Sequence, residues 1–152
     1  MLEIREDDLA GEPTRSLLAF HLAEARSNTP SEFSFALDLS GLQTPNITVW
    51  TAWDGAALAG VCALKDLGDG SGEVKSMRTD PKHLRRGVAR ALLEHIIGEA
   101  RRRGMSRLCL ETGKVSAYLP ALGLYRSIGF KDGEPFADYQ PSDFNQFLHM
   151  EL

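Results

Sequence analysis

The sequence has little cysteine and no long apolar run. Its two cysteines, Cys62 and Cys109, each stand among apolar neighbours. This setting is typical of small buried side chains rather than of a disulfide framework, so we expect no structural metal. The most apolar stretch, residues 58–64, has the length of a strand, and residues 1–6 carry acids where a secretory signal would be basic. We therefore expect a cytoplasmic protein that does not act at a membrane.

The sequence also lacks a surplus of basic residues. Its net charge is -4 at pH 7, which argues against a nucleic-acid partner because backbone phosphates are bound by excess Lys and Arg. Hydrophobic residues make up 43% of the chain and charged residues 25%, as in a globular protein. A length of 152 residues without repeats or a flexible linker predicts a single domain over residues 1–152.

Hydrophobic periodicity and turn signals predict an α+β fold. Runs of β-branched and aromatic residues indicate strands, and the Asp54-Gly55 pair indicates a hairpin between two of them. Apolar residues at a spacing of three and four indicate helices. We expect strands over residues 2–5, 47–53, 57–64, 73–79, 106–111 and 145–151, and helices over residues 13–27, 33–42, 87–103 and 117–127.

The most informative segment lies at the start of the clearest helix. Arg85, Arg86 and Arg90 surround Gly87 there, although cations are unfavourable beside the positive end of a helix dipole unless an anion is bound. The glycine lets the backbone approach a ligand, and the free N–H groups of the first turn can bind phosphate oxygens. The segment therefore predicts a diphosphate site. A glycine-tolerant helix start with solvated arginines is the alternative, and the absence of Walker and dinucleotide fingerprints argues against ATP and NAD.

Two segments resemble motifs of the GNAT acetyltransferases. Gly87, Val88 and Ala89 match the second half of motif A, and Leu84 stands where Gln or Arg is usual and can act through its backbone N–H. Residues 121–130 resemble motif B, which ends in Leu-Tyr-x-x-x-Gly-Phe. Residues 75–79, 111–113 and 136–139 further resemble a bacterial subgroup of small-molecule N-acetyltransferases (YsnE-like). The resemblance covers nearly the whole chain.

The resemblance implies a single-domain GNAT fold and acetyl-CoA as co-substrate, with no metal. The fold would be a mixed, mostly antiparallel twisted sheet of about six to seven strands flanked by about four helices. Backbone N–H groups of Met77 and Thr79 would contact the pantetheine and thioester, and Tyr118 stands where motif B often has Asn. The implied coenzyme-binding residues are Met77, Arg78, Thr79, Leu84, Arg85, Arg86, Gly87, Val88, Ala89, Arg90, Tyr118 and Tyr125.

Acetyl transfer to an amine needs a base for the amine and a proton for the leaving thiolate. Glu73 lies fourteen positions before Gly87, the spacing of the catalytic Glu in histone-type members, and is the expected base. Glu111, at the end of a neighbouring strand, is the second candidate. Tyr125 matches the motif B tyrosine that faces the coenzyme sulfur and is the expected acid. An exposed Glu73 and a buried core tyrosine are the corresponding structural interpretations.

The expected activity is transfer of an acetyl group to the primary amine of a small molecule within a ternary complex. Lys75 and Arg78 could hold a carboxylate on this acceptor. His21 and Glu24, one helical turn apart, could border its site or pair with each other on the surface. Phe33, Phe35, Phe136 and Tyr139 could form an apolar wall. The alternatives are a protein or peptide N-acetyltransferase and an acyl-CoA-binding regulatory module without turnover. Members of the family are often homodimers, which implies the same for this chain.

Overall fold

One mixed sheet forms the centre of the molecule. The computed structural model describes residues 2–30 and 36–152. Seven strands occur in the order β1-β2-β3-β4-β5-β7-β6, and every neighbouring pair is antiparallel except β4 and β5. The strands are β1 (Leu2–Asp7), β2 (Ile47–Asp54), β3 (Ala57–Asp66), β4 (Ser71–Thr79), β5 (Arg107–Gly113), β6 (Lys131–Asp132) and β7 (Asn145–Glu151). The predicted α+β class and the number of strands are confirmed.

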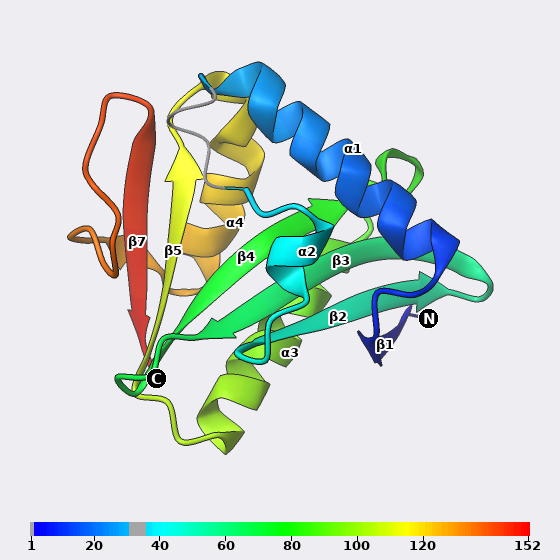
Figure 1. Ribbon diagram of the computed structural model, residues 1–152, viewed down its shortest axis with the longest axis horizontal. Helices are drawn as coiled ribbons and strands as arrows, with labels where there is room; N and C mark the ends of the chain where they lie inside the picture. The colour runs from blue at the N-terminus through cyan, green and yellow to red at the C-terminus, as the bar shows by residue number, and fades with distance from the viewer. Residues whose placement is uncertain (1, 31–35) are drawn as a thin grey trace.

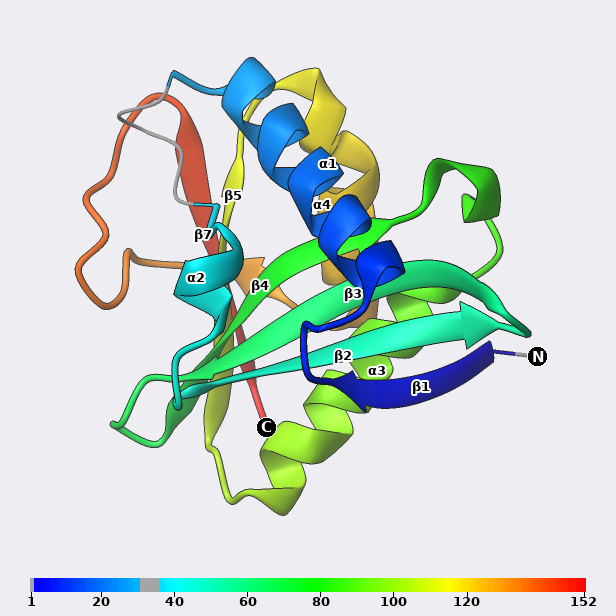
Figure 2. The ribbon, with the colours of Figure 1, turned by 45° about the vertical axis from the view of Figure 1, so that its right-hand side comes forward.

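Helices cover both faces of the sheet. Helices α1 (Glu12–Asn28) and α2 (Leu39–Leu42) lie on one face, and α3 (Val88–Arg102) and α4 (Leu119–Ile128) lie on the other (Figures 1 and 2). The alternation of side chains along a strand divides the apolar residues between the two faces. Strand β3 accordingly sends Val61 toward α1 and Leu64 toward α3, into separate cores. The sheet is therefore the middle of three layers.

Strands β4 and β5 separate partway along their length. Only residues 71–73 of β4 pair with β5, at Arg107–Cys109. Beyond this point β4 carries a β-bulge, since Ser76 and Met77 together oppose Cys62 of β3, and Ser76 has a left-handed φ of 55°. The bulge bends β4 away, while β5 continues along β7 (Figure 2). The result is a V-shaped opening within the sheet.

The structure differs from the sequence prediction at three elements. The helix expected over residues 33–42 is confined to Leu39–Leu42, because Asp38 caps it by accepting a hydrogen bond from the Gly41 N–H. Residues 33–35 of that prediction lie outside the described residues. A 3₁₀ turn (Ser116–Tyr118) precedes α4, which therefore begins later than predicted. Strand β6 was not predicted, because its two exposed residues are too few to show an alternating pattern.

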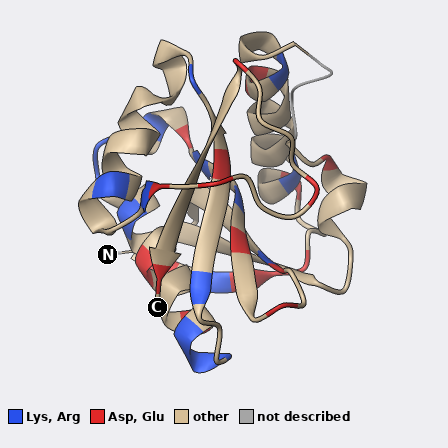
Figure 3. Ribbon diagram, turned by 90° about the vertical axis from the view of Figure 1, so that its left-hand side faces the viewer, with Lys and Arg blue, Asp and Glu red and all other residues tan. Residues whose placement is uncertain are grey.

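Charges and chain hydropathy agree with this architecture. Figure 3 shows basic and acidic residues interspersed along the ribbon rather than separated onto one face. Among residues 2–30 and 36–152, no helix combines the length and the apolar character needed to cross a membrane.

Candidate active site

The V between β4 and β5 is the floor of a cleft of about 760 Å³. Its walls are the diverging halves of the two strands, at residues 74–79 and 110–113. The start of α3, helix α4 and the second half of α1 close its sides. Residues far apart in the sequence are therefore brought to one cavity by the separation of two parallel strands.

One end of the cleft is the start of α3. Gly87 is the N-cap residue of this helix and has a left-handed φ of 79°, and no side chain caps the helix. Arg85 is also left-handed, with φ 63°. This conformation of the backbone leaves the first-turn N–H groups of α3 directed away from the helix, toward the cleft that Val88 and Ala89 line. The arrangement suits an anion with several oxygen atoms.

Most of the predicted phosphate-binding residues line this end. They are Leu84, Arg85, Gly87, Val88, Ala89 and Arg90, whereas Arg86 lies outside the cleft lining. The Arg90 guanidinium donates to Ser127 Oγ at 2.9 Å and lies 3.9 Å from Glu94. Leu84 is 58% exposed, an unusual setting for a leucine that leaves its side chain free at the rim of the cleft.

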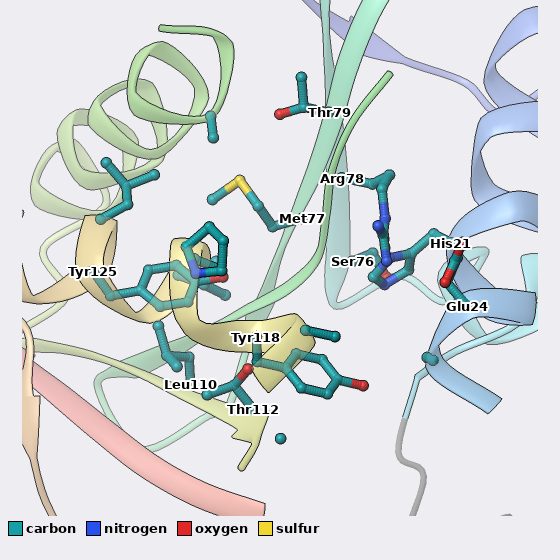
Figure 4. Close-up of a pocket in the computed structure, with 18 of the residues that line it drawn as sticks. His21, Glu24, Ser76, Met77, Arg78, Thr79, Leu110, Thr112, Tyr118 and Tyr125 are labelled. Carbon is teal, nitrogen blue, oxygen red and sulfur yellow. The ribbon is translucent and has the colours of Figure 1, made fainter. Parts of the chain in front are cut away.

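Tyr125 and Met77 face each other across the middle of the cleft (Figure 4). Tyr125 is 7% exposed, and among the described residues its hydroxyl group has no hydrogen-bond partner. Burial raises its pKa above the ordinary value, so the phenol stays protonated. Tyr118 also lines the cleft, and its ring packs so closely on Gly113 that a Cβ there would lie 2.3 Å from a ring carbon.

The opposite side of the cleft is polar. Arg78 extends toward α1, where its Nε donates to His21 Nδ1 at 3.1 Å (Figure 4). This half-buried guanidinium lies over the Phe20 ring, with 5.4 Å between Cζ and the ring centroid, and Glu24 is the nearby carboxylate that favours its charge. The guanidinium forms no ion pair within 4 Å in the described part of the chain. Desolvation and the charges of Arg78 and Lys75 lower the pKa of His21 to about 4, so His21 is neutral. Glu24 lines the cleft beside them.

Ser76 is a feature of this side that the sequence did not reveal. Its side chain is 9% exposed and lines the cleft, and its Oγ is buried without a hydrogen-bond partner. A buried hydroxyl without a partner costs about 1–3 kcal/mol. The left-handed φ of Ser76 adds backbone strain. No sequence pattern signals a bulge at this position, because Ser76 lies within an ordinary strand pattern.

Glu73, the predicted base, lies behind the cleft wall rather than on it. Its side chain is 2% exposed. It accepts hydrogen bonds from Tyr139 Oη at 2.5 Å and from Lys75 Nζ at 3.1 Å. Lys75 Nζ also donates to Tyr139 Oη at 2.8 Å. Lys75 lines the cleft, but its charge is already paired with Glu73, so it is less available to an acceptor carboxylate than Arg78 is.

Glu111 does line the cleft, on the β5 wall. Burial raises its pKa to about 7, and the charge of Glu73 adds to this effect, while Lys75 and Asn145 oppose it. A carboxyl group with such a pKa changes protonation state near neutral pH, as a general base should. Of the two candidate bases, Glu111 lies in the cleft lining and Glu73 does not.

The predicted aromatic wall is not formed as expected. Phe136 and Tyr139 pack with Cys109 and Phe147 in a small apolar cluster behind the cleft, outside its lining. Phe33 and Phe35 lie outside the described residues. Phe144, from the segment before β7, lines the cleft instead. Both cysteines are free and buried, as predicted, and the described residues contain no group of three or more His, Cys, Asp or Glu able to hold a metal ion.

The sheet thus opens between two parallel neighbours, β4 and β5, beside the uncapped start of α3. The profile of the Acetyltransferase (GNAT) family matches residues 14–130, and the chain belongs to this family. It is 47% identical to the uncharacterised N-acetyltransferase YsnE of Bacillus subtilis over 151 residues, covering 99% of this chain and 100% of YsnE. The chain is therefore an acetyltransferase.

Two further comparisons agree with this assignment. The uncharacterised N-acetyltransferase YedL of Escherichia coli is 44% identical over 152 residues, which cover all of this chain and 96% of YedL. A crystal structure from Klebsiella pneumoniae, classed provisionally as an acyl-CoA N-acyltransferase, superposes with a TM-score of 0.84 at 26% identity. It covers 100% of this chain and 98% of its own. The predicted GNAT fold is thereby confirmed.

Proposed function

We propose that the protein transfers an acetyl group from acetyl-CoA to the primary amine of a small molecule that carries a carboxylate. Transfer is direct, within a ternary complex. The observation that supports this most is the cleft itself, which joins an anion-binding helix start to a polar end containing Glu111 and Arg78. A cleft of about 760 Å³ offers room for the acetyl-bearing end of the coenzyme and for a small acceptor beside it.

The residues at the start of α3 fit the diphosphate of the coenzyme. Gly87 has nothing within 4 Å of the position of a Cβ, and α3 has no capping side chain. Arg85 and Arg90 supply positive charge beside the free N–H groups. When bound, the coenzyme supplies an acetyl thioester. The exposed backbone of the separated part of β4, at Met77 and Thr79, is available to hydrogen-bond its amide groups.

In this proposal Glu111 and Tyr125 divide the proton transfers. Glu111 removes a proton from the acceptor ammonium, directly or through water, so that the amine nitrogen can form a bond to the acetyl carbon. As the carbon–sulfur bond breaks, Tyr125 gives its phenolic proton to the sulfur. Two protons thus leave the acceptor nitrogen: Glu111 takes the first, and the second, released as the amide forms, restores the Tyr125 phenol after its own proton has gone to sulfur. The absence of a competing partner for the Tyr125 hydroxyl group supports this role.

Arg78 and Ser76 support an acceptor that carries a carboxylate. The guanidinium of Arg78 is half-buried without an ion-pair partner among the described residues, and a desolvated cation of this kind favours an anion. Ser76 Oγ, which is also unpartnered, can donate a hydrogen bond to the same group. Together they would hold the carboxylate on the α1 side of the cleft and direct the amine toward Glu111.

The test is coenzyme release from acetyl-CoA in the presence of paired acceptors. Each pair consists of one primary amine with its carboxylate intact and the same amine with that group amidated or removed; short peptides form a separate arm. We expect turnover with carboxylate-bearing amines. We further expect Arg78→Gln to raise their KM by about tenfold or more, since a charge-assisted hydrogen bond contributes about 1.5–3 kcal/mol.

Arg5→Gln serves as the control for loss of an arginine, because Arg5 is exposed, pairs with Glu3 and lies over the Trp53 ring at the far edge of the sheet, away from the cleft. It should leave the preference for a carboxylate intact. A preference for peptides over small amines would favour the protein-acetylating alternative. Coenzyme binding without turnover in every arm would favour a regulatory module.

A further inference from the structure

A closed group of three side chains lies directly behind the Glu111 side of the cleft. Lys75 Nζ donates to both Glu73 and Tyr139, and Tyr139 donates to Glu73, so that each member contacts the other two. Lys75 and Glu73 come from β4, two residues apart, and Tyr139 comes from the segment between β6 and β7. Only Lys75 reaches the cleft wall. The proposed reaction gives this group no direct part.

The arrangement is too costly to be incidental. Glu73 and Lys75 side chains are 2% and 9% exposed, and burying two charges costs several kcal/mol each before their attraction offsets it. Packing alone could be achieved with apolar side chains in this region, since Phe136 and Phe147 already surround Tyr139. A buried ion pair retained beside a cleft suggests an electrostatic role in that cleft.

We propose that Lys75 is a positioning residue that tunes Glu111 as the general base, and that Glu73 and Tyr139 hold and partly neutralise Lys75 for this purpose. This inference rests on the proposed function. A fully charged lysine would keep Glu111 ionised well below neutral pH and make it a weak base. With no lysine, burial would keep Glu111 protonated and inactive. The Lys75–Glu73 pair keeps the proton affinity of Glu111 between these two limits.

The β4–β5 ladder places this group beside Glu111. Glu73 is in register with Cys109, and because side chains alternate along a strand, residues 73 and 75 lie on the same face of the sheet as residues 109 and 111. Lys75 and Glu111 both line the cleft.

The charged and titratable groups around Glu111 come from several elements. Strand β4 contributes Lys75, which lowers the pKa of Glu111, and Glu73, which raises it. Strand β7 contributes the neutral Asn145, which lowers it. Tyr139 approaches from the segment before β7, and its own pKa is raised by burial and by the nearby Glu73 and Glu111 carboxylates, so its hydroxyl group stays neutral. The charge balance at Glu111 is therefore set by Lys75 and Glu73.

Removing each charge should move the titration of Glu111 in opposite directions. The measurement is a pH titration of the side-chain carboxyl carbons by ¹³C NMR on the full chain, with the Glu111 signal assigned by its loss in Glu111→Gln. Glu73→Gln removes the negative charge and should lower the Glu111 pKa by about one pH unit. Lys75→Met removes the positive charge and should raise it by a similar amount, as expected for charges within a few ångströms.

Tyr139→Phe and an external control complete the set. Tyr139→Phe frees Lys75 from one of its two partners and should broaden or shift the Glu111 titration without changing any charge. Glu94→Gln, on the exposed face of α3, should have no effect. Equal titration of Glu111 in wild type, Glu73→Gln and Lys75→Met would overturn the inference, as would shifts of the same sign. If Lys75→Met does not fold, Glu73→Gln decides alone.

Kinetics separates this inference from the proposed function. With an active acceptor, the acidic limb of the kcat/KM profile should move down in Glu73→Gln and up in Lys75→Met, while the KM for acetyl-CoA stays constant. If Glu73 and Lys75 served folding alone, their variants would have a lower melting temperature, but the acidic limb of the kcat/KM profile would stay at the same pH. Loss of turnover at every pH in folded Glu73→Gln would make Glu73 the base. Absence of turnover in wild type would contradict the proposed function, whereas the NMR titration would still test the tuning.

Discussion

Glu111 combines a position in the cleft wall with a pKa raised to about 7. If it is the base, kcat/KM should fall as the pH drops below about 7, because the carboxyl group becomes protonated and cannot accept a proton. We expect Glu111→Gln to reduce kcat by about 10²–10⁴-fold and to abolish this limb. The measurement is a pH–rate profile with an acceptor of low amine pKa, so that the amine does not produce the limb. A profile unchanged in the variant would assign the base elsewhere.

The same carboxyl group affects stability with a definite sign. Its pKa is about 7 in the folded chain and near 4.5 in the unfolded chain. As the pH rises through this interval the unfolded chain ionises first, so the free energy of unfolding falls and the loss is complete above about pH 7. Glu111→Gln should therefore stabilise the protein on the order of 1–3 kcal/mol at pH 8 and have little effect at pH 4. Chemical denaturation at the two pH values measures this difference.

Removal of the Tyr125 hydroxyl group tests whether this residue is the general acid. Replacement by Phe keeps the ring, which packs edge-on against Phe130, and removes only the hydroxyl group. If this group protonates the sulfur, kcat should fall by at least one to two orders of magnitude where chemistry limits the rate. The KM for acetyl-CoA should change little, the pattern of a contact made mainly in the transition state. Full kcat under those conditions would leave protonation of the sulfur to water.

Sequence reasoning located individual side chains unevenly. The family resemblance predicted correctly that Tyr125, Tyr118 and most residues around Gly87 line one cleft. It could do so because local motifs fix the positions of their backbones. It did not reveal that Glu73 lies behind the cleft wall while Glu111 lines it, because spacing along β4 does not indicate which side chains of a bulged strand reach the cleft. Ser76 was missed for the same reason. The identity of the base stays a prediction. The sequence also did not show that Lys75, unlike Arg78, is held in an ion pair, because that arrangement involves Glu73 and Tyr139, which lies sixty-four residues beyond Lys75.

At the level of elements, the turn before α3 can be tested with a matched pair of glycines. Gly87 and Gly104 have φ values of 79° and 80°, and neither has an atom within 4 Å of a Cβ position. Glu at either position should cost about 1 kcal/mol of stability through left-handed strain. Only Gly87→Glu should also abolish coenzyme binding, since it adds a negative charge beside the phosphate site.

Calorimetric titration with coenzyme A measures the difference between these two variants. Gly104→Glu lies at the end of α3 distant from Gly87 and reports the cost of strain alone. Equal losses of affinity in both variants would show that strain, rather than the phosphate site, is responsible. Wild-type affinity in folded Gly87→Glu would move the site away from α3.

Elements with strong periodicity were predicted well. Helix α3 has an apolar face and a glycine at each end, and β2 and β3 are joined by a clear hairpin turn. The short α2 was overextended because hydrophobic spacing continues before Asp38, whereas the capping hydrogen bond of Asp38 sets the observed start. Strand β6 depends wholly on pairing with β7, a contact that no local pattern encodes.

For the whole molecule, ligand-induced stabilisation tests the coenzyme site without knowledge of the acceptor. Acetyl-CoA and coenzyme A should raise the melting temperature, corresponding to about 2.7 kcal/mol at one hundred times Kd. ATP and NAD should raise it much less, because neither has a pantetheine chain that could extend from the diphosphate site along the separated part of β4. Equal stabilisation by all four compounds would contradict the assignment. The homodimer stays a prediction that sedimentation analysis can check.

The short β4–β5 ladder has a mechanical consequence. Three rungs of hydrogen bonds, at residues 71–73, connect the β1–β4 half of the sheet to the β5–β7 half. Local opening of a fold begins where few hydrogen bonds must break. We therefore expect β4 and β5 to separate transiently before either half of the sheet unfolds. A ligand bound between β4 and β5 would contact both strands and so oppose their separation. Amide hydrogen exchange should then slow on coenzyme binding along residues 74–79 and 110–113, and much less along β1 and β2.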